Sequence, residues 1–280
     1  MAINLAGIEM KNPVMVASGT YGYGKEFADY TDLNKLGALV TKTVTLKARE
    51  GNPPPRICET PSGMLNTIGL QNPGIEKFLK EAIPFLKKLK IPVIINIAGE
   101  TIEEFAELAK ILEKEKVVKG IEVNVSCPNV KSGGMAFGCD PDLVSKITKS
   151  VKKAVSAPVI VKLTPNVTDI TLIAKAAEAA GADAITAINT VLGMSFDLKT
   201  GKPKLSRGVG GLSGPAIRPI AVRCVWQIAQ AVKIPVIGVG GIMTSDDAKE
   251  FFLAGAKAVQ VGTANFVDTE AAVKVAAGLK

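Results

Sequence analysis

The strongest constraint on the fold is an alternation of short apolar runs with longer helix-like segments along the 280-residue chain. The apolar runs are rich in Val, Ile and Ala and are typical of buried strands. Eight of them cover Val14–Thr20, Ala38–Val44, Pro92–Ala98, Gly120–Ser126, Pro158–Thr164, Ala184–Thr190, Pro235–Gly241 and Ala258–Ala264. The helical segments are Ile75–Leu89, Thr101–Leu112, Asp140–Val155, Asp169–Ala180, Gly214–Val232 and Ser245–Ala254. Strand followed by helix, repeated, predicts parallel strands with right-handed crossovers.

Eight such units favour an α/β fold of the closed TIM (β/α)8 barrel type, with residues 1–280 forming a single domain. The strands are apolar almost throughout, which indicates burial on both faces. An open doubly wound sheet is the alternative, and it would require a GxGxxG fingerprint between a strand and a helix. The nearest match, Gly208–Ser213, ends in Ser and follows a polar turn, so we expect it in a loop. The long connections Leu46–Ile75 and Val191–Gly214 are expected to be functional loops.

Composition excludes several function classes. The chain has no histidine, which excludes a Ser-His-Asp triad, a Cys-His pair and a His-ligated zinc. Its net charge of +8 comes from scattered lysines and aromatic residues make up only 5%, which argues against nucleic-acid binding. Four cysteines without a CxxC spacing predict neither a metal site nor an iron–sulfur cluster on this chain. With no targeting segment and no long apolar run, we expect a cytoplasmic protein that does not bind membranes.

Small and polar residues follow the predicted strands, where a barrel places its chemistry. Glycines follow the last two strands, where free backbone N–H groups commonly bind phosphate, so the pattern indicates a phosphorylated ligand. The strand-end residues are Ala17, Ser18, Lys42, Thr43, Asn96, Asn124, Cys127, Lys162, Asn189, Thr190, Gly240, Gly241, Gly262 and Thr263.

Lys42 and Lys162 stand on predicted barrel strands, where a buried charge requires an anionic partner. We expect that partner to be an anionic ligand, although a Schiff-base lysine is the competing interpretation. Several asparagines near the strand ends favour a flat heterocycle with alternating C=O and N–H groups, namely Asn66, Asn96, Asn124 and Asn189.

Cys127 is the one plausible proton-transfer group at a strand end, because a thiolate can act as a general base. The alternative is a small buried hydrophobic residue. The glycine-containing segment from Cys127 to Cys139 is expected to act as a lid over the site.

Three motifs resemble the dihydroorotate dehydrogenase family: Asn124–Asn129, Asn66–Asn72 and Thr41–Thr43. The Ser-Cys-Pro-Asn sequence is similar to that of the cysteine-base class, and Pro128–Gly134 with Gly69–Gly74 resembles its NAD-dependent B type. Membership would imply oxidation of dihydroorotate to orotate in pyrimidine biosynthesis, with hydride transfer to FMN. It would also imply an electron-transfer partner subunit carrying FAD and a [2Fe–2S] cluster, in a heterotetramer built around a homodimer of catalytic chains.

The resemblance implies roles for individual residues. Cys127 would be the base, and Lys162 would stabilise the reduced flavin. The FMN-binding residues implied are Ala17, Ser18, Lys42, Thr43, Asn96, Asn124, Lys162, Ile188, Gly214, Gly240, Gly241, Gly262 and Thr263. The substrate-binding residues implied are Lys42, Asn66, Thr67, Ile68, Gly69, Leu70, Asn124, Asn189 and Thr190.

Three alternatives remain open. The first is the fumarate-reducing A type of the same family. The second is another FMN-barrel dihydropyrimidine oxidoreductase, although such proteins typically have His where this chain has Asn129. The third is a barrel without catalytic activity, serving as a phosphate-ligand binder or a scaffold.

Overall fold

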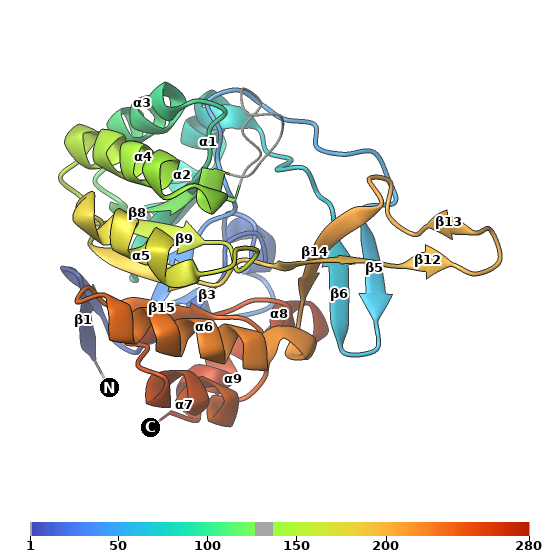
Figure 1. Cartoon of the computed structure of the whole chain (residues 1–280). Helices are drawn as coiled ribbons and strands as arrows, with labels where there is room; N and C mark the ends of the chain where they lie inside the picture. The colour runs from blue at the N-terminus through green and yellow to red at the C-terminus, as the bar shows by residue number, and fades with distance from the viewer. Residues whose placement is uncertain (1, 127–136, 280) are drawn as a thin grey trace.

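The computed structural model describes residues 2–126 and 137–279, in which eight parallel strands close into a barrel (Figure 1). Each strand lies within one of the eight predicted runs or overlaps it, so the predicted TIM barrel is confirmed. In order around the barrel the strands are β3 (Val14–Val16), β4 (Ala38–Val40), β7 (Val93–Ile97), β8 (Val118–Asn124), β9 (Val159–Leu163), β10 (Ala184–Ala187), β15 (Val236–Val239) and β16 (Ala258–Val261).

Helices cover the outside of the barrel (Figure 1). They are α1 (Gly74–Glu81), α2 (Ile83–Leu86), α3 (Ile102–Leu112), α4 (Pro141–Ala154), α5 (Ile170–Ala179), α6 (Arg218–Ala231), α7 (Ser245–Leu253), α8 (Ala264–Val267) and α9 (Ala271–Ala277). Four begin behind a residue whose side chain accepts a backbone N–H, namely Thr101, Asp140, Asp169 and Thr244. Such N-caps satisfy donors that the first helical turn leaves free, and they set where these helices start. Within the described residues, no helix is both long and apolar enough to cross a bilayer.

The amino-terminal end of the barrel is closed by a hairpin that the sequence analysis did not predict. Its strands, β1 (Ile3–Leu5) and β2 (Ile8–Met10), pair antiparallel. Leu5, Ile8 and Met10 are buried against interior residues near the starts of the barrel strands, including Met15 and Ile160. This end of the interior is therefore a packed apolar core, and the opposite end is left for chemistry.

The two long connections form a second layer of structure beside the barrel. Strands β5 (Ile57–Thr60) and β6 (Gly63–Asn66) from the first pair with β14 (Val209–Ser213) and β11 (Val191–Met194) from the second, in the order β11-β14-β6-β5. A further hairpin of β12 (Phe196–Asp197) and β13 (Lys202–Pro203) projects from this sheet (Figure 1). The 3-10 turns are Lys25–Phe27, Leu33–Lys35, Phe137–Cys139 and Pro215–Ile217.

The expectation of a loop at Gly208–Ser213 is wrong, because Val209–Ser213 is the strand β14. Its glycines allow the strand to approach its neighbours closely. A Cβ atom on Gly210 would lie 2.7 Å from the backbone oxygen of Asn66, and one on Gly211 would lie 2.1 Å from the hydroxyl oxygen of Thr190. These glycines therefore serve strand packing, which explains why they resembled a loop in the sequence.

One close approach gives a direct test of the barrel-to-helix packing. Gly238 on β15 faces the fully buried ring of Phe251 on α7, and a Cβ atom at Gly238 would lie 2.4 Å from Cδ1 of that ring. We expect Gly238→Ala to lower the free energy of unfolding by about 1–3 kcal/mol through overpacking. Phe251→Leu should relieve the clash, so the double variant should lose less than the sum of the single losses in urea unfolding. Strict additivity would contradict this account.

Candidate active site

The carboxyl ends of the eight strands meet at one end of the barrel, here called the carboxyl rim. Five residues on this rim form the glycine cradle: Gly214, Gly240, Gly241, Gly262 and Thr263. Gly214 and Gly241 have φ angles of 97° and 75°, and a Cβ atom on Gly241 would lie 2.8 Å from the Gly214 carbonyl oxygen. The hydroxyl of Thr263 donates to the Ser213 hydroxyl at 2.8 Å, which joins the cradle to β14. The structure thus brings together the residues predicted to bind phosphate.

The cradle suits a phosphate group, because four of its five residues are glycines, three of them with positive φ angles that suit tight turns. Backbone N–H groups in such turns are the usual ligands of phosphate at this position in TIM barrels. Ala17 lies beside the cradle, since a Cβ atom on Gly262 would be 3.5 Å from that of Ala17. Ile188 lies on the other side, 3.6 Å from a Cβ atom on Gly240. Ser18 follows Ala17 at the same rim and is partly exposed.

Below the rim, the barrel interior holds a polar layer built around Glu122 on β8. This carboxylate is fully buried and accepts from the Asn96 amide at 2.7 Å, the Thr186 hydroxyl at 2.8 Å and the Gln260 amide at 2.7 Å. It also forms an ion pair with Lys162, whose Nζ is 3.7 Å from Oε1. Lys162 was expected to require an anionic ligand, and the structure supplies a carboxylate of the chain itself as its partner.

Asn96 links this polar layer to Thr43, which follows the barrel strand β4. Its amide oxygen accepts from the Thr43 hydroxyl at 2.6 Å, while its nitrogen donates to Glu122. Asn96 is fully buried and Thr43 is 7% exposed. Asn96 therefore holds Thr43 in place from below the rim.

Lys42 is partly buried at the rim, next to Thr43. Burial lowers the pKa of its ammonium group, and the nearby guanidinium of Arg56 lowers the pKa further, against an opposing effect of Glu26. Arg56 donates to the Gln71 side chain at 2.7 Å. A partly buried cation at the rim favours an anionic ligand beside it.

Two of the predicted asparagines meet across the rim. The Asn189 amide donates to the Asn124 amide oxygen at 3.3 Å, and Asn189 also accepts from the Thr190 backbone N–H at 2.8 Å. Asn66 lies on the small sheet, where its amide donates to the Gly211 carbonyl at 3.3 Å. Asn66 and Asn189 are partly exposed, whereas Asn124 is buried, with 8% of its surface accessible.

The segment from Thr67 to Leu70 is held by two asparagines that the sequence analysis did not single out. Asn52 donates to the Thr67 carbonyl at 2.9 Å, and its backbone N–H donates to the Ile68 carbonyl at 3.0 Å. Asn72 donates to the Leu70 carbonyl at 2.8 Å. Gly69 has a φ of 73°, and a Cβ atom there would lie 2.7 Å from the Asn52 nitrogen, so this turn requires glycine.

Glu122, Arg56 and Asn166 were likewise not predicted from the sequence. Glu122 was visible as an acidic residue within an apolar run, which is the signal that could have found it. Asn166 donates to the Thr190 carbonyl at 3.0 Å and accepts from the Leu192 N–H at 2.9 Å, contacts that depend on tertiary structure alone. Cys127 and the expected lid up to residue 136 lie outside the described residues.

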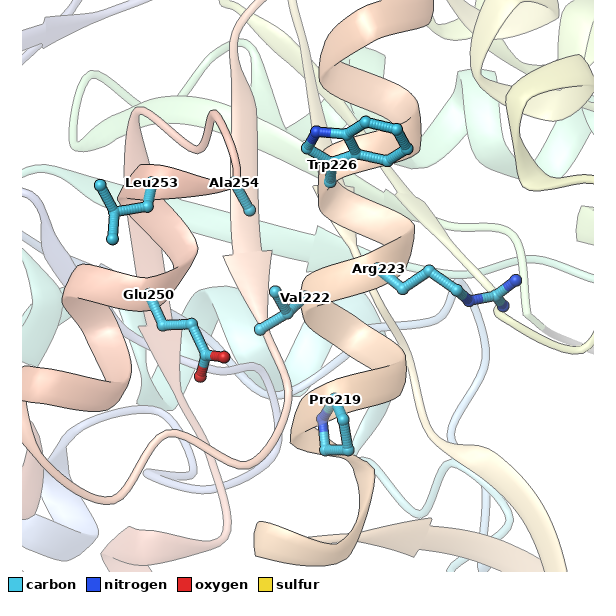
Figure 2. A pocket seen from close by; sticks show the side chains of 7 residues that line it. All are labelled: Pro219, Val222, Arg223, Trp226, Glu250, Leu253 and Ala254. Atoms are coloured by element: carbon cyan, nitrogen blue, oxygen red, sulfur yellow. The ribbon is translucent and has the colours of Figure 1, made fainter.

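A surface groove elsewhere does not belong to this site. It runs between α6 and α7 on the outer face of the barrel and is lined by Pro219, Val222, Arg223, Trp226, Glu250, Leu253 and Ala254 (Figure 2). None of its residues is at a strand end.

Asn72 gives a test of how the rim segment is held. Its side chain makes four hydrogen bonds, to the N–H and hydroxyl of Thr45, the N–H of Gly74 and the carbonyl of Leu70. We expect Asn72→Ala to lower the free energy of unfolding by about 1–3 kcal/mol, because buried groups lose their partners. It should also speed amide hydrogen exchange in residues 67–74. Asn12→Ala, which removes bonds at the opposite end of the barrel, is the control and should leave exchange in residues 67–74 unchanged.

Comparison with known proteins agrees with this geometry. The family model described as dihydroorotate dehydrogenase matches residues 1–280. The chain is 56% identical to "Dihydroorotate dehydrogenase B (NAD(+)), catalytic subunit" of Geotalea uraniireducens, over 100% of this chain and 92% of that protein. Proteins of the same description from Citrifermentans bemidjiense and Thermoanaerobacter pseudethanolicus are 57% and 56% identical, over 99% and 100% of this chain and 90% and 92% of theirs. The resemblance inferred from the sequence motifs is thus confirmed, and the chain belongs to the dihydroorotate dehydrogenase family.

Proposed function

We propose that the chain is the catalytic subunit of an NAD-dependent dihydroorotate dehydrogenase and oxidises dihydroorotate to orotate in pyrimidine biosynthesis. The observation that carries the proposal is the convergence, on one barrel rim, of a glycine cradle with lysine and amide side chains. The glycine cradle suits a phosphate, and the lysine and amide side chains suit a flat anionic heterocycle. The relatives, all described as catalytic subunits of this enzyme, support the same activity.

FMN is the proposed cofactor, with its phosphate on the glycine cradle. Bound there, FMN would supply the acceptor for the hydride that leaves C6 of dihydroorotate. Lys162 and the other side chains of the rim would hold the ring of FMN. The residues proposed to hold FMN directly are Ala17, Ser18, Lys42, Thr43, Asn124, Lys162, Ile188, Gly214, Gly240, Gly241, Gly262 and Thr263. Asn96 was expected among them, but it is fully buried and would act through Thr43.

Dihydroorotate would bind between the rim and the small sheet. The proposed substrate residues are Lys42, Asn66, Thr67, Ile68, Gly69, Leu70, Asn124, Asn189 and Thr190. The Lys42 ammonium group suits the substrate carboxylate. Asn124 and Asn189 offer amide donors and acceptors to the ring. The backbone from Thr67 to Leu70, held by Asn52 and Asn72, would form one wall of the pocket.

Cys127 and Lys162 are the proposed catalytic residues. The Cys127 thiolate would take the proton from C5 of dihydroorotate, as a general base whose pKa approaches the working pH. The Lys162 ammonium would stabilise negative charge on the ring it faces, an effect that grows as water is excluded.

The proposed assembly rests on the resemblance to the NAD-dependent B type, which implies a partner subunit that carries FAD and a [2Fe–2S] cluster and passes electrons to NAD. The lack of a cluster spacing among the four cysteines of this chain agrees with it. The words "catalytic subunit" in the relatives' description support such a partner. We propose a heterotetramer around a homodimer of catalytic chains, located in the cytoplasm.

An anaerobic visible spectrum of the purified chain tests the function. We expect a yellow protein whose flavin absorbance bleaches on addition of dihydroorotate. Cys127→Ala should keep the colour and lose at least 99% of the bleaching rate, because general-base catalysis contributes about 10²–10⁴-fold. Cys224→Ala, at a buried cysteine of α6, is the matched control and should bleach normally. A yellow wild-type protein that stays yellow would refute the substrate, and a colourless one that cannot be reconstituted would refute the cofactor.

The lowered pKa of Lys42 predicts a pH dependence of substrate affinity. The ammonium group is charged below its pKa and neutral above it, so dihydroorotate should bind best at lower pH. KM should therefore rise as the pH increases, and the rise should begin at a pH below the pKa of an ordinary lysine. We expect a rise of about tenfold or more, since a hydrogen bond to a charged group contributes about 1.5–3 kcal/mol. Lys42→Arg keeps its charge and should abolish the rise, while Lys47→Arg, at an exposed neighbour, should retain it. A rise that persists in Lys42→Arg would assign the titration to another group.

A further inference from the structure

Glu122 occupies a position where a barrel interior ordinarily has an apolar side chain. It is completely inaccessible to solvent, whereas the Lys162 side chain above it is 7% exposed. Glu122 can therefore contact neither substrate nor cofactor directly. A buried ion pair seldom stabilises a fold better than apolar residues of the same size, because both charges must be desolvated. Fold stability alone therefore does not explain this carboxylate.

The hydrogen bonds around Glu122 have a fixed direction. An ionised carboxylate only accepts, so the Asn96 and Gln260 amides must turn their nitrogens toward it. The oxygen of Gln260 then faces Lys162 and accepts from its Nζ at 3.3 Å. The oxygen of Asn96 faces Thr43, whose hydroxyl must donate to it at 2.6 Å.

Through these hydrogen bonds Glu122 affects two residues of the carboxyl rim, Lys162 and Thr43. Lys162 is held from below by Glu122 and Gln260, each at one side of its ammonium group. Thr43 uses its hydroxyl proton on Asn96 and can offer only its oxygen lone pairs to a ligand. One buried charge thus sets a cationic donor at β9 and an acceptor beside β4.

We propose that Glu122 is a positioning residue for the flavin site, which orients Lys162 directly and Thr43 through Asn96. This inference rests on the proposed function, because it assumes FMN on the rim. It adds that the donor and acceptor pattern offered to the flavin ring is determined by a carboxylate that does not touch the ring.

Glu122→Asp separates position from charge, because it keeps the carboxylate and shortens its reach by one methylene. We expect the apoprotein of this variant to bind FMN at least tenfold more weakly than wild type. The midpoint potential of its bound flavin should shift to more negative values, since Lys162 would be drawn away from the ring toward the shorter side chain. The shift in potential should disappear in the Lys162→Met background, whereas the part of the affinity loss that acts through Asn96 and Thr43 should remain.

Two further variants keep the inference open to refutation. Glu122→Gln has the same size and can donate, so it should misorient the neighbouring amides and weaken FMN binding even if the aspartate variant folds poorly. Thr148→Val removes a buried hydroxyl bonded to the Val144 carbonyl on α4 and controls for general loss of stability. It should leave the flavin potential unchanged.

The outcomes separate this inference from the proposed function. If wild type binds FMN and is reduced by dihydroorotate while Glu122→Asp matches it in affinity and potential, the positioning role is refuted and the function stands. A potential that shifts equally with and without Lys162 would also refute the role. If wild type binds no FMN, both proposals fail together.

Discussion

Closure of the barrel by the pairing of β3 with β16 is the constraint on which the rest of the structure depends. Val259–Val261 pair in parallel with Val14–Val16, so the first and last barrel strands lie side by side. Because every strand runs in the same direction, all the carboxyl ends reach one rim. This closure brings Ala17, near the start of the chain, next to Gly262 of the glycine cradle.

The barrel interior then divides into two layers with different chemistry. The amino-terminal layer is apolar and is sealed by the β1–β2 hairpin. The next layer contains Glu122 and Lys162, which would each be costly to bury alone. Each charge compensates the other, and three neutral donors satisfy the remaining lone pairs of the carboxylate. The apolar layer keeps water away from this network, which strengthens its electrostatic interactions.

A feature of the structure could be predicted from the sequence where the residues that form it are close together in the chain. The barrel strands were predictable because strands buried on both faces appear as continuous apolar runs. Four of the five cradle residues were predictable because they directly follow β15 and β16, whereas Gly214 follows β14 and was named only through the family resemblance. The small sheet was not, since β14 is rich in glycine and pairs with β6 from a distant part of the chain. Asn52 and Asn72 were missed for a related reason: their partners are backbone groups whose positions only the folded loops define.

The site therefore has two parts with different structural origins. The cradle and the polar layer belong to the barrel strands and the turns that end them, where packing on all sides limits movement. The wall formed by residues 67–70 belongs to a long connection and is held by a few asparagine hydrogen bonds. Under the proposed function, changes in that wall would alter which ring is accepted without disturbing the cradle. A rigid site for the proposed phosphorylated cofactor and an adaptable wall for the proposed substrate would then follow from placing one on strands and the other on loops.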